Sequence, residues 1–262
     1  MICIADNIQI TRKVIENALN SYSREPIMEQ VRICEQHGAD MIDINTGPLT
    51  RNPEDKMRFF VETVQEATSL PLMLDTSNPI ALKAGLEICR NTVYINGFSL
   101  EPHKLETILP LAVTYRAKIV GYLLNPDSSV PLNALERMDR ALSLFEECSR
   151  RGLDLEQLII DPVLVPLLWA DGSLQAMDVL EVIRSLPDLL GFPVKTIVGL
   201  SNLTTGAPDP EKKYLMERTY AAMLGMAGID MVLMNITRRQ TVDTLKAASI
   251  LMKRRVFSWE EL

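Results

Sequence analysis

Short carboxylate and amide side chains recur where apolar runs end in this 262-residue chain, as in "MIDIN" (41–45), "MLDTSN" (73–78) and "LIID" (158–161). One Asp or Asn at the end of a strand is an ordinary turn former. Eight apolar runs end this way, on Asp6-Asn7, Asp43 to Asn45, Asp75, Asn96, Asn125, Asp161, Asn202 and Asn235. Eight such endings predict a ring of polar groups at the edge of an active site.

The predicted ring contains no Lys, Arg or His, so it is poorly suited to clamping phosphates or holding a transition metal. Asp accepts hydrogen bonds, and Asn both accepts and donates them. This set suits a flat heterocycle that carries several N–H donors and one carbonyl, and a pterin has this pattern. Buried carboxylates must be paired or protonated, so the site would depend on the hydrogen bonds of its ligand.

The apolar runs are nearly continuous in Val, Ile, Leu and Met, which is typical of parallel strands buried on both faces. Strands are predicted at 2–7, 40–45, 70–75, 91–96, 118–125, 157–161, 195–202 and 231–235. Amphipathic patterns between and after them predict helices at 27–39, 52–68, 132–152, 211–228 and 241–254. Eight strand–helix units in a chain of this length predict an α/β fold, a single (β/α)8 TIM barrel that spans 1–262 as one domain. An open doubly wound sheet is the alternative, but no G-x-G-x-x-G opens the chain.

Two local features refine this picture. Asn52 is predicted to cap the helix at 52–68, because Pro53 and two acidic residues follow it. The irregular segment 161–173 is too apolar for a flexible tether, so we expect it to pack over the mouth of the barrel, with Trp169 as a wall or a dimer contact.

Composition excludes several classes of protein. The net charge of -7 provides no basic stripe for nucleic acid. No apolar run approaches the ~18 residues of a membrane helix. The first residues lack the basic region of a secretion signal, so a cytoplasmic protein is expected.

Cysteine and histidine are scarce. Cys3, Cys34, Cys89 and Cys148 form no C-x-x-C pair, so neither a metal site nor a disulfide framework is expected. His37 precedes Gly38 and is interpreted as the end of a helix. His103 is expected in the first turn of a helix, with a place in a site as the alternative. A Ser-His-Asp hydrolase is disfavoured by this shortage.

Five short motifs together are more specific than any one of them: "DINTG" (43–47), "LDTSN" (74–78), "YING" (94–97), "IIDP" (159–162) and "GLSN" (199–202). Through essentially the whole chain, this ordered set resembles the pterin-binding barrel family. More closely, it resembles the methyltetrahydrofolate:corrinoid protein methyltransferases of anaerobic one-carbon metabolism.

The resemblance implies roles for particular residues. The family's pterin-holding aspartate, asparagine and aspartate match Asp75, Asn96 and Asp161, and the asparagine beside the methyl-bearing nitrogen matches Asn202, the implied catalytic residue. Further pterin contacts are expected from Asp43, Asn45, Gly199 and Ser201, and additional candidates are Asp6, Asn7, Asn125 and Asn235. The family's first strand carries Glu-Arg-[IL]-Asn, whereas this chain has Asp6 to Gln9, "DNIQ".

The implied function is methyl transfer between the position-5 nitrogen of tetrahydrofolate and the cobalt of a corrinoid, with the direction open. No D-x-H-x-x-G string is present, so the corrinoid (cobalamin) is expected on a separate partner protein. A homodimer is also expected. One alternative is dihydropteroate synthase, for which Arg238 and Arg239 would supply the cations that a pyrophosphate requires. A folate-binding protein without catalytic activity is the other alternative.

Overall fold

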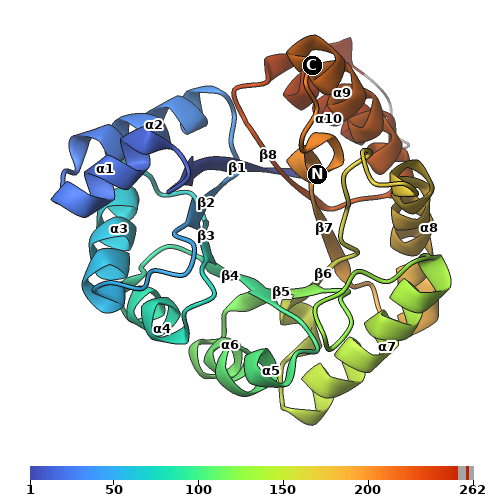
Figure 1. The fold of residues 1–262 in the computed structure, drawn as a ribbon, viewed down its shortest axis with the longest axis horizontal. Coiled ribbons are helices and arrows are strands. Elements are labelled where there is room, and N and C mark those ends of the chain that lie inside the picture. Colours follow the sequence, from blue (N-terminus) through green and yellow to red (C-terminus); the bar gives the residue numbers. More distant parts are fainter. Residues whose placement is uncertain (253–257, 260–262) are drawn as a thin grey trace.

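Eight parallel strands close into a barrel in chain order, and the helices form a ring around it (Figure 1). The computed structural model describes residues 1–252 and 258–259. The strands are β1 (Ile2–Gln9), β2 (Met41–Asn45), β3 (Leu72–Asp75), β4 (Val93–Phe98), β5 (Lys118–Tyr122), β6 (Leu158–Asp161), β7 (Lys195–Gly199) and β8 (Met231–Met234). The predicted TIM barrel is therefore confirmed, and the doubly wound sheet is wrong.

The helices connect these strands and cover their outer faces. They are α1 (Lys13–Ser21), α2 (Glu25–Gln36), α3 (Pro53–Ala67), α4 (Pro79–Ile88), α5 (Pro102–Thr107), α6 (Leu109–Tyr115), α7 (Ala134–Arg150), α8 (Gly172–Leu190), α9 (Pro210–Ala227) and α10 (Arg239–Met252), with short 3-10 turns η1 (Leu155–Gln157) and η2 (Leu200–Thr204). The last helix was predicted to reach 254, and residues 253 and 254 lie outside the described part of the chain. No helix of the described residues is long and apolar enough to cross a membrane.

The helix ends test the capping predictions. Asn52 occupies the N-cap position of α3 but has a left-handed backbone (φ 49°), and its side chain makes no capping hydrogen bond, so that part of the prediction is wrong. Asn78 instead caps α4, since its side-chain oxygen accepts hydrogen bonds from the backbone of Ile80 and Ala81. His37 does end α2, and Gly38 follows it with φ +82°.

The barrel interior is filled in layers. A lower, apolar layer takes one side chain from each strand: Ile4, Met41, Met73, Tyr94, Val120, Ile159, Ile197 and Met231. Side chains two residues apart on a strand point to the same face, so the next inward positions toward the carboxyl end form the layer above. Those positions are Asp6, Asp43, Asp75, Asn96, Tyr122, Asp161, Gly199 and Leu233. The sequence thus places an apolar floor directly below a mostly polar layer.

Strand β4 approaches its neighbour β5 closely at Gly97. A Cβ atom built on Gly97 would collide with the backbone carbonyl oxygen of Val120, which cannot rotate away. At Gly121, on β5, an added Cβ would instead meet the tip of the Leu144 side chain, 2.6 Å away. A side chain repacks more easily than a backbone shifts, so the two glycines differ in what they tolerate.

We expect Gly97→Ala to lower the free energy of unfolding by about 3 kcal/mol or more, and Gly121→Ala by about 1–2 kcal/mol, because only the first forces two strands apart. Urea unfolding followed by circular dichroism would measure both variants. Equal losses would contradict the close approach of β4 and β5.

Candidate active site

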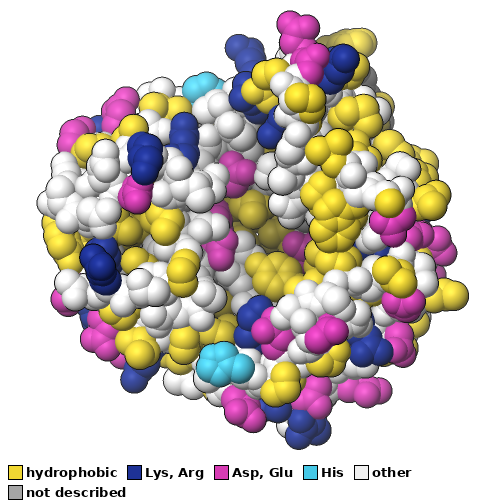
Figure 2. Space-filling view, viewed as in Figure 1, with side chains coloured by type: hydrophobic (Ala, Val, Ile, Leu, Met, Phe, Trp, Pro, Cys, Tyr) yellow, Lys and Arg dark blue, Asp and Glu magenta, His cyan; other side chains and the backbone are white. Residues whose placement is uncertain are grey.

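A cavity of ≈ 250 Å³ opens at the carboxyl ends of the strands, where a barrel of this type carries its chemistry. Its lining residues are Asp6, Gln9, Asp43, Asn45, Asp75, Asn96, Tyr122, Asp161, Ile197, Gly199, Ser201, Asn202 and Leu233. Acidic side chains surround the central hollow in Figure 2. No lysine, arginine or histidine is among these lining residues. Most residues proposed from the sequence are therefore brought together in one place.

Three predicted candidates lie outside the cavity lining. The Asn7 side chain points out of the barrel, where it donates a hydrogen bond to Asn235 (2.8 Å) and accepts one from the backbone of Ile236 (2.9 Å). Asn235 also accepts from the backbone of Thr237 (3.1 Å), so it stabilises the turn after β8. Asn125 lies in the loop after β5, because that strand ends at Tyr122 rather than at 125. The prediction that all eight strand ends contribute Asp or Asn to the site is therefore wrong for β5 and β8, and for Asn7 of β1.

Four lining residues were missed in the sequence: Gln9, Tyr122, Ile197 and Leu233. Tyr122 follows Val120 by two residues, so the inward period of β5 could have revealed it. Gln9 could not be found in this way. The pairing of β1 with β2 shifts between Ala5 and Ile8, which adds one residue and places Gln9 opposite Asn45.

Tyr122 and Asp43 hold the amide of Asn96 between them. The phenol of Tyr122 donates a hydrogen bond to Asn96 Oδ1 (2.6 Å), and Asn96 Nδ2 donates to Asp43 Oδ1 (3.4 Å). Burial and the nearby carboxylates raise the pKa of Tyr122 well above its usual value, so it remains a protonated donor. The oxygen of Asn96 is thereby occupied, and its second N–H is left to face a ligand.

A second hydrogen-bond chain ends on Asp75. The backbone N–H of Gly47 donates to Asn45 Oδ1 (3.1 Å), which turns the amide so that Asn45 Nδ2 donates to Asp75 Oδ2. Asn45, Asp75 and Asn96 are paired in register on β2, β3 and β4. The two hydrogen-bond chains therefore bring their carboxylates to adjacent positions of one cavity.

Burial dominates the electrostatics of this cavity. It raises the pKa of Asp75 to about 7 and that of Asp6 to about 6. The pKa of Asp43 is raised well above its usual value by burial and by the charge of Asp75, against the smaller opposing effect of the Asn96 hydrogen bond. These carboxylates are largely enclosed by protein atoms, but they still face the cavity. A bound ligand with N–H donors would therefore be well suited to donate hydrogen bonds to them.

Asp161 is held from outside the barrel. Its Oδ1 accepts a hydrogen bond from the backbone of Val163 (2.8 Å), a residue with φ 64°. Fully buried Arg137 of α7 fixes this turn by donating to the carbonyl oxygen of Pro162 (2.9 Å) and to Gln175 Oε1 (2.7 Å). Burial raises the pKa of Asp161 to about 7, and the Val163 hydrogen bond and the Arg137 charge partly oppose that rise.

Asn202 lies at the edge of the cavity, in η2, and its side chain is exposed. It makes no side-chain hydrogen bond to another described residue, so it does not cap the turn after β7. A Cβ on Gly199 would lie 3.1 Å from Asn202 Nδ2, so a larger residue at position 199 would displace this amide. The neighbouring Ser201 hydroxyl donates to Asp6 Oδ2 (3.4 Å).

Other sequence candidates do not line the cavity. His103 is exposed in the first turn of α5. Trp169 is half exposed and is not a wall of the cavity, although its loop is tied down by the hydrogen bond from Leu167 N to the Leu203 carbonyl oxygen (2.9 Å). Within residues 1–252 and 258–259, no three His, Cys, Asp or Glu side chains are grouped to hold a metal ion.

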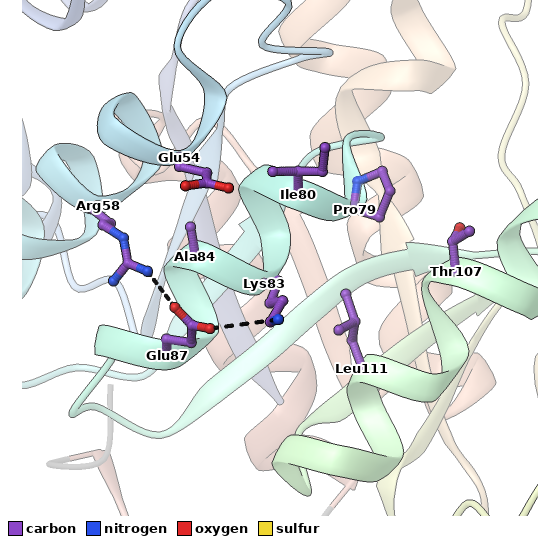
Figure 3. A pocket seen from close by; sticks show the side chains of 9 residues that line it. All are labelled: Glu54, Arg58, Pro79, Ile80, Lys83, Ala84, Glu87, Thr107 and Leu111. Carbon is purple, nitrogen blue, oxygen red and sulfur yellow. Dashed lines mark hydrogen bonds and ion pairs between the residues drawn. The ribbon is translucent and has the colours of Figure 1, made fainter.

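A larger hollow of ≈ 510 Å³ lies on the outer wall, between α3, α4 and the α5–α6 pair (Figure 3). Its charges already pair with one another: Glu87 contacts Arg58 and lies 4.0 Å from Lys83. The mouth cavity instead contains carboxylates whose pKa is raised by burial. We therefore assign the chemistry to the mouth of the barrel.

The comparison with known families agrees with this geometry. Residues 13–235 match the model of the pterin binding enzyme family. The chain belongs to that family. The predicted resemblance to pterin-binding barrels is confirmed, and family membership identifies the protein as an enzyme.

Individual relatives differ in how much of their length the chain covers. The methylcorrinoid:tetrahydrofolate methyltransferase of Eubacterium limosum is 25% identical over 248 residues, which is 94% of this chain and 87% of the relative. The methionine synthase of Mycobacterium tuberculosis is 21% identical over 213 residues, 77% of this chain but only 17% of the relative.

Solved structures share the fold. Dihydropteroate synthase of Yersinia pestis, in complex with a sulfonamide drug, superposes with a TM-score of 0.70 at 12% identity and covers 97% of this chain and 94% of its own. The Xanthomonas albilineans enzyme with 4-aminobenzoic acid has a TM-score of 0.68 at 18% identity, with 97% and 93% covered. These identities establish the barrel alone.

We expect Asp75→Asn to stabilise the ligand-free protein at pH 8 by about 1–3 kcal/mol. The folded-state pKa of about 7 exceeds the ordinary value of 3.8, so the folded protein binds more protons between these values and loses stability as the pH rises through them. The neutral amide removes that loss, and the advantage should vanish only at about pH 3.5, below the ordinary value of 3.8.

Chemical unfolding at the two pH values would measure this effect. Asp188→Asn is the matched control, because Asp188 is exposed near the end of α8 and its replacement should have the same small effect at both values. A pH-independent effect of Asp75→Asn would contradict the buried-charge explanation.

Proposed function

We propose that the protein is a methyltransferase that moves a methyl group between the position-5 nitrogen of tetrahydrofolate and the cobalt of a separate corrinoid protein. The observation that carries this proposal is the cavity itself, where four carboxylates and two oriented amides meet without any cationic side chain. The name of the Eubacterium limosum relative supports it. Arg238 and Arg239, which the synthase alternative requires, both lie outside the cavity lining.

The pterin head of the folate would bind flat above the apolar floor. Its ring N–H and 2-amino donors would pair with Asp75 and Asp161, and Asn96 would donate its free N–H to a ring acceptor. The raised pKa values of the two aspartates mean that these groups gain more from ligand donors than exposed carboxylates would. Asp43, Asn45 and Tyr122 would act as positioning residues.

A tertiary amine is a poor leaving group, so the transfer needs stabilisation at the nitrogen. When the C–N bond breaks, its electron pair stays on nitrogen, which takes up a proton; cobalt(I) supplies the pair for the new bond to the methyl carbon. Asn202 would donate to the nitrogen as its charge changes. Its exposed amide has no hydrogen-bond partner among the described residues, which supports a role toward a ligand.

The open edge of the cavity beside Asn202 is where the corrinoid partner would dock. The transfer is an in-line displacement between cobalt and nitrogen, so the same groups serve both directions. The proposal also includes a cytoplasmic homodimer. Exposed apolar side chains before and along the start of α8, namely Leu168, Trp169, Leu174 and Met177, support an interface there.

We expect Asp75→Ala to weaken binding of methyltetrahydrofolate by about 2–4 kcal/mol, because a charged hydrogen bond is lost and a ligand donor is left unpaired. Asn96→Ala and Asp161→Ala should also weaken it. Titration calorimetry measures all three, with Asp188→Asn as an exposed control. Unchanged affinity in the three cavity variants would rule out the pterin assignment.

We expect Asn202→Ala to lower the methyl-transfer rate by about 10²–10³-fold, the range for loss of one preorganised donor, while folate affinity changes much less. Single-turnover kinetics at saturating methyltetrahydrofolate, with a cobalt(I) corrinoid protein and the cobalt spectrum as readout, measures the rate. A folded variant with the wild-type rate would remove Asn202 from the mechanism. A folate-binding protein without activity would show no transfer in the wild type.

A further inference from the structure

A second, smaller hollow adjoins the cavity at its edge. It lies between η2, β8 and α9, and Ser201 lines both the cavity and this hollow. Two cations face it, Arg238 after β8 and Lys213 in α9. The guanidinium of Arg238 lies 3.7 Å from the centre of the Tyr214 ring, so stacking holds it in place.

The positive charge of this hollow is weakly compensated. The guanidinium of Arg238 makes no hydrogen bond or ion pair with another described residue. Lys213 Nζ approaches Glu217 only to 3.8 Å, and Glu217 is buried and accepts a hydrogen bond from the Thr204 hydroxyl (2.5 Å). In a chain of net charge -7, two such cations beside an acidic cavity point to an anionic ligand group.

The cavity is too small for a whole folate. Its ≈ 250 Å³ is below the roughly 300–1,000 Å³ of pockets that enclose drug-sized ligands, so it accommodates the bicyclic head alone. The carbon that bears the benzoylglutamate tail adjoins the position-5 nitrogen in the ring. If that nitrogen lies beside Asn202, the tail leaves the cavity beside Ser201 and Asn202, toward the second hollow.

We propose that Arg238, held by Tyr214 and assisted by Lys213, binds the glutamate carboxylates of the folate tail. This inference rests on the proposed function. It adds a binding site for the ligand tail that lies outside the polar cavity. Arginine suits the role because its planar fork donates two parallel hydrogen bonds to one carboxylate. The acidic cavity would repel those carboxylates, so the subsite also fixes which end of the ligand enters.

The test compares two ligands with the same tetrahydropterin head, tetrahydrofolate and 6-methyltetrahydropterin, of which the second lacks the benzoylglutamate. Arg238→Gln should weaken binding of the folate by about five- to tenfold and leave the pterin unchanged. Lys213→Gln should have a smaller effect with the same selectivity. Arg239→Gln is the matched control, since the neighbouring arginine lies 3.8 Å from Asp243 of its own helix and faces a different hollow.

Titration calorimetry at low and high salt would give the affinities, with thermal melts to verify folding. Equal effects of Arg238→Gln on both ligands, or no effect on either, would overturn the inference. So would equal loss of folate affinity in Arg239→Gln. If the wild type bound neither ligand, the proposed function itself would be contradicted. If it bound both ligands tightly and with equal affinity, only the proposed tail subsite would be contradicted.

Discussion

The removal of four carboxylates from bulk water is the constraint on which the rest of the site depends. Asp6, Asp43, Asp75 and Asp161 line one cavity, and burial raises the pKa of each of them. Such groups destabilise the empty protein at neutral pH and are stabilised by a ligand that brings hydrogen-bond donors. The barrel tolerates this cost because its apolar floor and its outer shell of helices supply the stability.

Orientation matters as much as charge. The amides of Asn45 and Asn96 could each point either way, yet a backbone N–H and the phenol of Tyr122 fix them so that both donate to carboxylates. A third device, the buried Arg137, fixes the turn that carries Asp161 without entering the cavity. The polar layer is therefore preorganised by contacts on several strands and on α7, which is the condition for tight recognition of a rigid heterocycle.

The site divides into parts with different environments. The closed interior suits an uncharged head with many donors, and the exposed edge carries Asn202, where a second macromolecule has access. The cationic hollow beyond Ser201 differs from both because stacking on Tyr214, rather than an ion pair, holds its arginine. This division would match the three parts of the proposed ligand, a methylated folate: the ring, the reacting nitrogen and the charged tail.

Repetition in the sequence was sufficient for the fold and for most of the site. Eight apolar runs predicted the barrel, and their polar ends predicted Asp43, Asp75, Asn96 and Asp161, because both depend on local period and composition. Tertiary structure decided the rest. The extra residue in β1 turned Gln9 inward, and the early end of β5 left Asn125 in a loop. Neither a shift in strand register nor the length of a paired strand is visible locally, since both are set by the neighbouring strands.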